Sequence, residues 1–247
     1  MGTVFGRESR TEALLQHIAT HNQQVNQRLD ALLGLNSIVL SSLNVYDAMS
    51  MTSAGRVQGL NEDLCTRFSY DPGVCMLTQQ TGTCTLAHIL PFSSKRSSPV
   101  MNLLQLTPDQ LDSSENLLLL ADNIELAFDS LRVSFVPAIQ EGMIERYVLK
   151  IWDDSVRDEP LFTHGHARTI GEFENCPLQL HEDHRLFRRC LTFQSFWAAA
   201  RHLGGHFSAN SLPFDMASLD EPHRANFLRL LQVKQTELRH DINAEVV

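Results

Sequence analysis

The sequence predicts an α+β protein, with helices toward both ends of the chain and short strands in the middle. Apolar residues recur at helical spacing over residues 9–33 and again after Thr163. Between these regions, from Val74 onward, short apolar or β-branched segments alternate with turn residues, which is typical of strands. The pattern indicates a small mixed core with helices packed against it.

Two helices are predicted before the core. The first spans residues 9–33, because Ser9 and Glu12 form a capping box at its start and Gly34 can end it. The second spans residues 37–51. These amphipathic helices can pack on the main domain or form a dimer seam, and packing is favoured.

The middle of the chain predicts strands separated by connections. The expected strands are residues 74–77, 83–90, 117–120, 132–136 and 147–152. A short helix is expected at residues 122–131, where Ile124, Ala127, Phe128 and Leu131 recur at helical spacing. The connection 93–114 contains Ser and Pro residues and is expected to hold one helical turn at 101–106.

The chain is predicted to become helical again beyond Thr163. Pro177 suits a first helical turn, and the apolar residues that follow it form one large face. Ser218 and Glu221 make a capping box for a final helix. We therefore expect an N-terminal helical segment (1–60), a central domain (61–205) and a C-terminal helix (206–247).

Composition and charge argue against several classes of protein, namely those with an extended DNA-binding surface, a membrane helix or a secretory signal. The net charge of −9 counts against an extended DNA-binding surface and leaves only local basic patches. No apolar run is long enough for a membrane helix, and the start does not resemble a secretory signal, so an intracellular protein of the cytoplasm or nucleus is expected.

Five cysteines without a C-x-x-C pair indicate free thiols. Phosphate-loop, dinucleotide-binding and serine-hydrolase motifs do not occur.

Three segments follow one another in a fixed order. They are Cys-Met-Leu-Thr at 75–78, Leu-Ala-His-Ile-Leu-Pro-Phe at 86–92, and the stretch 116–137, which runs from Asn116 through Phe128-Asp129 to Pro137. This order resembles the HNH endonuclease family in the form widespread in fungi. The third histidine of the family pattern is replaced by Glu125. The resemblance covers about residues 75–137, and residues 176–184 are similar to a helix start found downstream in the family.

The resemblance implies a ββα-metal fold with a hydrolytic site. In such a site His88 would act as general base on a water, and Asn116 would orient its ring by a hydrogen bond. Glu125 would be a metal ligand, with Asp122 and Asp129 one helical turn away on either side. Carboxylates suit Mg²⁺ or Mn²⁺ better than Zn²⁺, so a divalent metal of that kind is expected as cofactor.

The basic pair Lys95 and Arg96 follows the predicted base and is expected to contact phosphate, which makes nucleic acid the expected partner. His181 and His184 are the best candidates from outside the motif to reach the site. Each candidate also has a structural interpretation: His88 as a buried histidine, Asn116 as a turn residue and Glu125 as a solvated helix residue.

Three functional hypotheses stay open. The first is a metal-dependent nuclease. The second is a binding or regulatory protein on an inactive HNH scaffold, favoured by Glu125, by Ala87 and by the acidic balance, with the terminal helices forming a homo-oligomer or partner surface. The third is a His88 pocket adapted to acid–base chemistry on a small molecule. Neither DNA or RNA preference nor the pathway follows from the residues.

Overall fold

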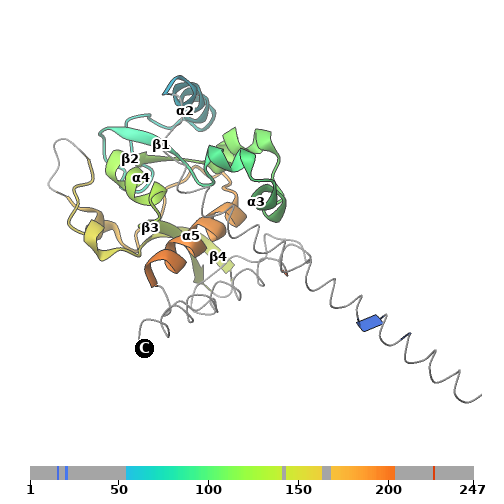
Figure 1. The fold of residues 1–247 in the computed structure, drawn as a ribbon. Helices are drawn as coiled ribbons and strands as arrows, with labels where there is room; N and C mark the ends of the chain where they lie inside the picture. The colour runs from blue at the N-terminus through green and yellow to red at the C-terminus, as the bar shows by residue number, and fades with distance from the viewer. Residues whose placement is uncertain are drawn as a thin grey trace, which may run out of the picture.

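The computed structural model describes residues 16, 20–21, 54–140, 143–162, 168–203 and 225, and confirms the α+β prediction. Its strands form two separate antiparallel pairs, β1 with β2 and β3 with β4 (Figure 1). The predicted helices at 9–33, 37–51 and after Ser218 lie outside the described residues, apart from residues 16, 20, 21 and 225, which have helical backbone. Among the described residues, no helix is both long and apolar enough to cross a membrane.

Strand β1 (Cys84–His88) pairs with β2 (Leu117–Ala121), with Cys84 opposite Ala121 and His88 opposite Leu117. The long connection 89–116 joins the two strands, and this antiparallel pair is named the first hairpin. All five residues of β2 are buried. A strand covered on both faces needs apolar side chains at every position, which explains the run of four leucines. Helix α2 (Ala54–Phe68) precedes this hairpin along the chain.

The strand predicted at 74–77 was wrong, because the chain turns there. Val74 makes only an isolated bridge to Thr81, and the N–H of Gln79 returns to the carbonyl of Cys75 at 2.9 Å. Gln79 has a left-handed φ of 55°, which closes this turn. Met76 still donates its N–H to Leu119 of β2 at 2.9 Å, so the turn is fastened to the first hairpin.

The connection between β1 and β2 is built from short helical turns. In order they are η1 (Phe92–Arg96), α3 (Ser98–Leu103), η2 (Pro108–Asp112) and η3 (Ser114–Asn116). The helical turn predicted at 101–106 begins earlier, at Ser98, because Pro99 stands in its first turn. It ends early because Gln105 adopts a left-handed φ of 51°.

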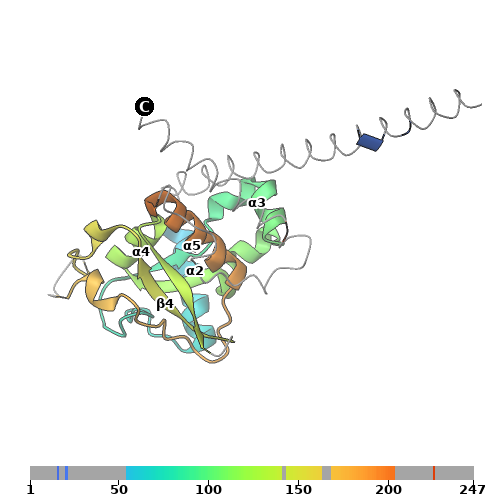
Figure 2. The ribbon, with the colours of Figure 1, turned by 90° about the horizontal axis from the view of Figure 1, so that it is seen from below.

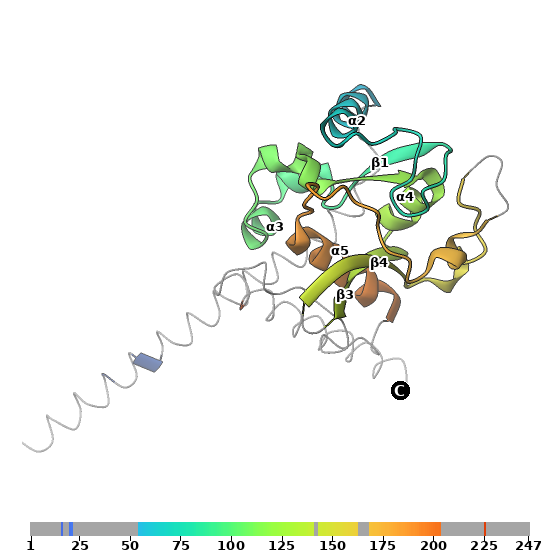
Figure 3. The same cartoon turned by 180° about the vertical axis from the view of Figure 1, so that it is seen from behind.

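Helix α4 (Asp122–Asp129) follows β2 directly, as the spacing of its apolar residues predicted. Ile124, Ala127 and Phe128 are buried, and the helix lies between the two hairpins (Figure 3). Leu131, with a φ of 62°, then turns the chain into the second hairpin. Strand, strand and helix therefore stand in the order that a ββα unit requires.

The second hairpin pairs β3 (Val133–Gln140) with β4 (Met143–Ile151). Helix α5 (Arg188–Leu203) packs against β3 (Figure 2). Its buried Gln194 donates to the carbonyls of Phe128 and Val133 at 3.1 and 3.0 Å, which joins α5 to both α4 and β3. Buried polar groups need such partners.

The helical start predicted at Pro177 was also wrong. Residues 175–178 extend along β4 instead: Pro177 bridges Val148, and Leu178 donates its N–H to Tyr147 at 2.8 Å. Edge pairing with a strand distant along the chain thus outweighs the local helical pattern. The helix begins only at Arg188.

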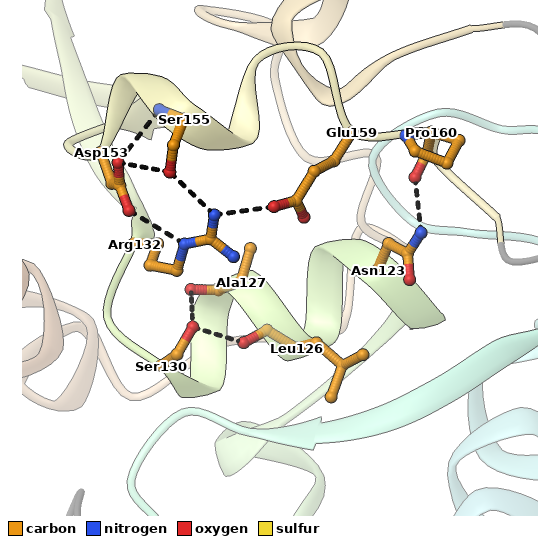
Figure 4. A network of polar contacts seen from close by, with 9 residues as sticks. All are labelled: Asn123, Leu126, Ala127, Ser130, Arg132, Asp153, Ser155, Glu159 and Pro160. Carbon is orange, nitrogen blue, oxygen red and sulfur yellow. Dashed lines mark hydrogen bonds and ion pairs between the residues drawn. The ribbon is translucent and has the colours of Figure 1, made fainter.

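A polar network holds the segment after β4 against α4 (Figure 4). The Arg132 guanidinium contacts Asp153 at 3.0 Å, Ser155 at 3.0 Å and Glu159 at 2.7 Å. At the other end of α4, Asn123 donates to the carbonyl of Pro160 at 2.8 Å. Both ends of α4 are therefore fixed from the same loop.

All five cysteines are free thiols, as the sequence predicted. Burial raises the pKa of both Cys84 and Cys190 to about 12. Because the thiolate is the reactive form, these two thiols stay protonated and react slowly near neutral pH.

Candidate active site

His88 stands at the last position of β1, where the chain leaves the first hairpin. Its side chain is only 8% exposed, and its Nε2 lies 3.5 Å from Oδ1 of Asp112. That distance is long for a hydrogen bond but within the range of an ion pair when the ring is protonated. Asp112 is 32% exposed, so the pair reaches solvent on the Asp112 side.

Sequence reasoning did not single out Asp112. It is the last residue of η2, which begins with a capping box between Thr107 and Gln110. Leu111 beside it is fully buried and anchors the turn in the core. The capping box predicts a turn here, but only the folded chain brings its final carboxylate to His88.

Asn116 is fully buried and holds the backbone around this pair. Its side-chain nitrogen donates to the carbonyls of Leu90 and Leu111, each at 2.9 Å, and its side-chain oxygen accepts from the N–H of Leu90 at 2.9 Å. Its main-chain carbonyl accepts from Ile89 at 2.8 Å. These bonds fix the residues after His88 and before Asp112. The ring-orienting role of Asn116 stays a prediction.

The carboxylates of α4 form a second group. Glu125 and Asp129, one helical turn apart, share a hydrogen bond. Burial and the neighbouring Glu125 carboxylate raise the pKa of Asp129 to about 8. Burial, with the charge of Asp122 adding to it, also raises the pKa of Glu125. The pair therefore holds a proton at neutral pH, because two adjacent buried carboxylates cannot both be charged at low cost.

A divalent metal is what the resemblance implies for this domain. Within the described ranges, no group of three or more His, Cys, Asp or Glu side chains could hold a metal ion. The donors present at α4 are carboxylates, which suit a hard cation that fills its remaining positions with water and phosphate. They do not suit the His and Cys sets of zinc sites. The two carboxylates of Glu125 and Asp129 are thus donors of the kind that Mg²⁺ or Mn²⁺ binds, and the metal site stays a prediction.

The basic pair Lys95 and Arg96 is exposed on η1. Lys95 Nζ lies 5.4 Å from the centre of the Phe92 ring. Turn η1 packs against η2, the turn that ends at Asp112. Two positive side chains therefore stand on a turn packed beside the one that carries the partner of His88.

Of the two downstream histidines, His184 reaches this region. It is buried, and its Nε2 lies 2.8 Å from the carbonyl of Ser114, between Asp112 and Asn116 in the chain. His181 is 40% exposed and makes its ion-pair contact with Asp183 at 3.8 Å.

Comparison with known families gives one result. Residues 74–136 match the HNH endonuclease model, a span that includes β1, β2, α4 and the connection between the strands. No curated protein and no solved structure matches the chain. The match suggests nuclease activity in general and is compatible with nucleic-acid binding. Residues 74–136 thus match the HNH endonuclease family, which confirms the resemblance to HNH endonucleases over that span.

Proposed function

We propose that this protein hydrolyses phosphodiester bonds in nucleic acid, with His88 as the general base and a divalent metal as cofactor. The observation that carries the proposal is the buried contact of 3.5 Å between His88 and Asp112, inside the span that matches the HNH endonuclease family. An imidazole beside a carboxylate is a common arrangement for moving protons in hydrolytic enzymes.

The reaction needs one proton transfer at His88. The ring takes a proton from a water molecule, and the water oxygen attacks phosphorus. The bond between phosphorus and the leaving oxygen then breaks, and that oxygen takes a proton from solvent. Asp112 keeps the ring in place and stabilises the positive charge that the ring gains. Asn116 contributes by holding the backbone on both sides of the pair.

Substrate would approach from the side of Asp112, because His88 itself is nearly covered. Lys95 and Arg96 are exposed on the neighbouring turn. A guanidinium can bind two phosphate oxygens at once, and an ammonium attracts the same group as a point charge. These two side chains would hold the backbone of the nucleic acid at the site. The overall charge of −9 makes such a local patch more important for binding.

Glu125 and Asp129, one helical turn apart, are the two residues that would hold the metal, with phosphate and water filling its other positions, and Asp122 stands at the start of the same helix. A bound divalent cation would neutralise charge on the phosphate and on the leaving oxygen. Magnesium is usually held by one or two carboxylates together with phosphate oxygens and water. The carboxylate pair therefore suits a cation that binds together with the substrate.

The test is cleavage of plasmid DNA and of single-stranded RNA by the purified full chain. Each reaction is run with Mg²⁺, Mn²⁺, Ni²⁺ or Zn²⁺ and with a chelator. We expect cleavage with Mg²⁺ or Mn²⁺ and a loss of roughly 10²-fold or more in His88→Ala, the range for removing a general base. His181→Ala is the matched control, because it removes an exposed histidine and should cleave normally.

Two outcomes would count against the proposal. Absence of cleavage of both substrates with all four metals would exclude the nuclease. Cleavage that persists in His88→Ala would show a different base or a contaminating enzyme. A protein that binds nucleic acid without cutting it would support the alternative of a binding protein on an inactive scaffold.

A further inference from the structure

Two side chains, those of Phe68 and Tyr70, and the main-chain carbonyl of Ser114 meet at His184, just before α5. The ring of His184 stacks on Phe68 at the end of α2, with 4.6 Å between ring centres and an interplanar angle of 20°. Its Nδ1 lies 3.0 Å from the hydroxyl of Tyr70, and its Nε2 lies 2.8 Å from the carbonyl of Ser114. Only 3% of His184 is exposed. Both ring nitrogens are therefore engaged inside the protein.

The partners define which nitrogen carries the proton. A main-chain carbonyl can only accept, so Nε2 must carry a hydrogen and donate it to Ser114. Burial lowers the pKa of His184, so the ring is neutral and Nδ1 accepts. Tyr70 must then donate its hydroxyl hydrogen to Nδ1, and its oxygen accepts the N–H of His181 at 2.6 Å. The result is a one-directional chain of hydrogen bonds that ends at Ser114.

Ser114 lies at the centre of the segment that supports the candidate site. Its carbonyl also accepts the N–H of Leu117, the residue paired with His88 across the first hairpin. Its hydroxyl accepts from Arg67 of α2 at 3.1 Å. Asp112 precedes it by two residues and Asn116 follows it by two. Movement of the Ser114 carbonyl would thus shift residues on both sides of the His88–Asp112 contact.

We infer that His184 is a positioning residue for the His88–Asp112 pair, acting through the carbonyl of Ser114. The inference rests on the proposed function, since the pair has a task only if His88 is the base. Its physical reason is that proton transfer needs a fixed geometry, and a displacement of about 1 Å can cost about 10²-fold in rate. Residues 181–187, outside the span that matches the family, would in this way help to build the site.

The first test reads backbone protection and does not depend on activity. Amide hydrogen exchange of Ile89 and Leu90 reports the bonds that these residues donate to Asn116, and Leu149 in the second hairpin serves as internal reference. In His184→Ala we expect exchange of Ile89 and Leu90 to rise by roughly 10-fold or more relative to Leu149. In His181→Ala, which keeps the main-chain N–H bonded to Tyr70, the ratio should not change.

The second test separates the two ring nitrogens by substitution. His184→Gln can place an amide N–H near the position of Nε2, whereas His184→Asn places its amide near Nδ1. We expect kcat of His184→Gln to stay within a few-fold of the wild type. His184→Asn and His184→Ala should lose about 10-fold to 100-fold in kcat with little change in KM. A role confined to stability would lower the melting temperature of all three variants without this order in kcat.

The outcomes separate failure of this inference from failure of the proposed function. Equal increases in exchange at Ile89, Leu90 and Leu149 would mean global destabilisation and would overturn the positioning role. So would an unchanged ratio in folded His184→Ala. If the wild type cleaves nothing but the exchange ratio rises as expected, the nuclease proposal fails while the structural coupling stands. Should His184→Ala not fold, Tyr70→Phe tests the same chain of bonds, with a smaller expected rise.

Discussion

The side chain of Asn116 bonds to Leu90 twice, donating to its carbonyl and accepting from its N–H, with both distances 2.9 Å. A side-chain amide that pairs with one residue in this way imitates the pairing of a β-strand. Strand-like hydrogen bonding therefore continues to Leu90, two residues past His88, where β1 ends. The strand end that carries the predicted base is therefore held by a side chain from the far end of the connection.

Replacing Asn116 should destabilise the protein strongly. Asn116→Ala removes three side-chain hydrogen bonds and leaves polar backbone groups unpaired in the core, which should cost about 2–4 kcal/mol. Urea unfolding measures the loss. Asn123→Ala is the matched control, because it removes one exposed bond to Pro160 and should cost about 1 kcal/mol or less. Equal losses of unfolding free energy in the two variants would contradict this stabilising role of the Asn116 side chain.

Replacing Asp112 should affect activity more than stability. Asp112→Asn keeps the shape of the side chain but removes the charge that stabilises a protonated His88, so we expect kcat to fall by roughly 10-fold to 100-fold. The unfolding free energy should change by about 1 kcal/mol or less, because Asp112 is partly exposed. Asp109→Asn, on the exposed side of the same turn, should leave kcat unchanged. Normal activity of Asp112→Asn would remove the carboxylate from the mechanism.

Stability should decline in mild acid through His184. Burial places the pKa of this ring below its usual value of 6.5 in the folded protein. Between the two values the unfolded chain binds more protons, so the unfolding free energy should fall as pH drops below about 6.5. The charged and titratable groups around the ring are Tyr70, Glu115, Arg67 and His181.

Urea unfolding between pH 7.5 and pH 5 tests this dependence. His184→Gln cannot take up the proton, so its stability should decline less steeply than that of the wild type over this range. The difference between the two curves isolates His184 from other groups that titrate in the same range, such as His202, whose pKa burial also lowers. Parallel curves would show that His184 contributes nothing to the acid response.

Metal binding should depend on the carboxylates of α4. Calorimetric titration with Mn²⁺ in the presence of a short uncleavable nucleic-acid analogue should show binding that Glu125→Ala weakens by about 10-fold or more. Glu182→Ala, which removes an exposed carboxylate outside the span that matches the family, is the control. Equal affinities of Glu125→Ala and the wild type would place the metal elsewhere or remove it from the proposal.

The Arg132 network should contribute to stability as a unit. Its side chain contacts Asp153, Ser155 and Glu159 (Figure 4), and Arg132→Ala would release the loop that fixes α4. We expect a loss of about 1–2 kcal/mol in urea unfolding, more than for a single surface ion pair, because several bonds share one guanidinium. Arg132→Lys should recover only part of it, since an ammonium cannot form the same fork. Full recovery would mean that charge alone matters.

Much of the central domain was determined by local pattern. The spacing of Ile124, Ala127 and Phe128 predicted α4, and the four leucines before it predicted a strand, which the structure buries at every position. Both features depend on which positions of an element are apolar, and the sequence records that directly. The match over residues 74–136 has the same origin, because it depends on residues in a fixed order along the chain.

The tertiary structure alone decided which groups meet. Asp112 pairs with His88, and His184 reaches Ser114, because long connections close over the first hairpin. Pro177 joins β4 and Val74 turns back, although their local patterns predicted a helix and a strand. Spacing along the chain predicts contacts only within one element. Contacts between elements depend on the shared burial of many side chains, and no single segment of the sequence specifies that burial.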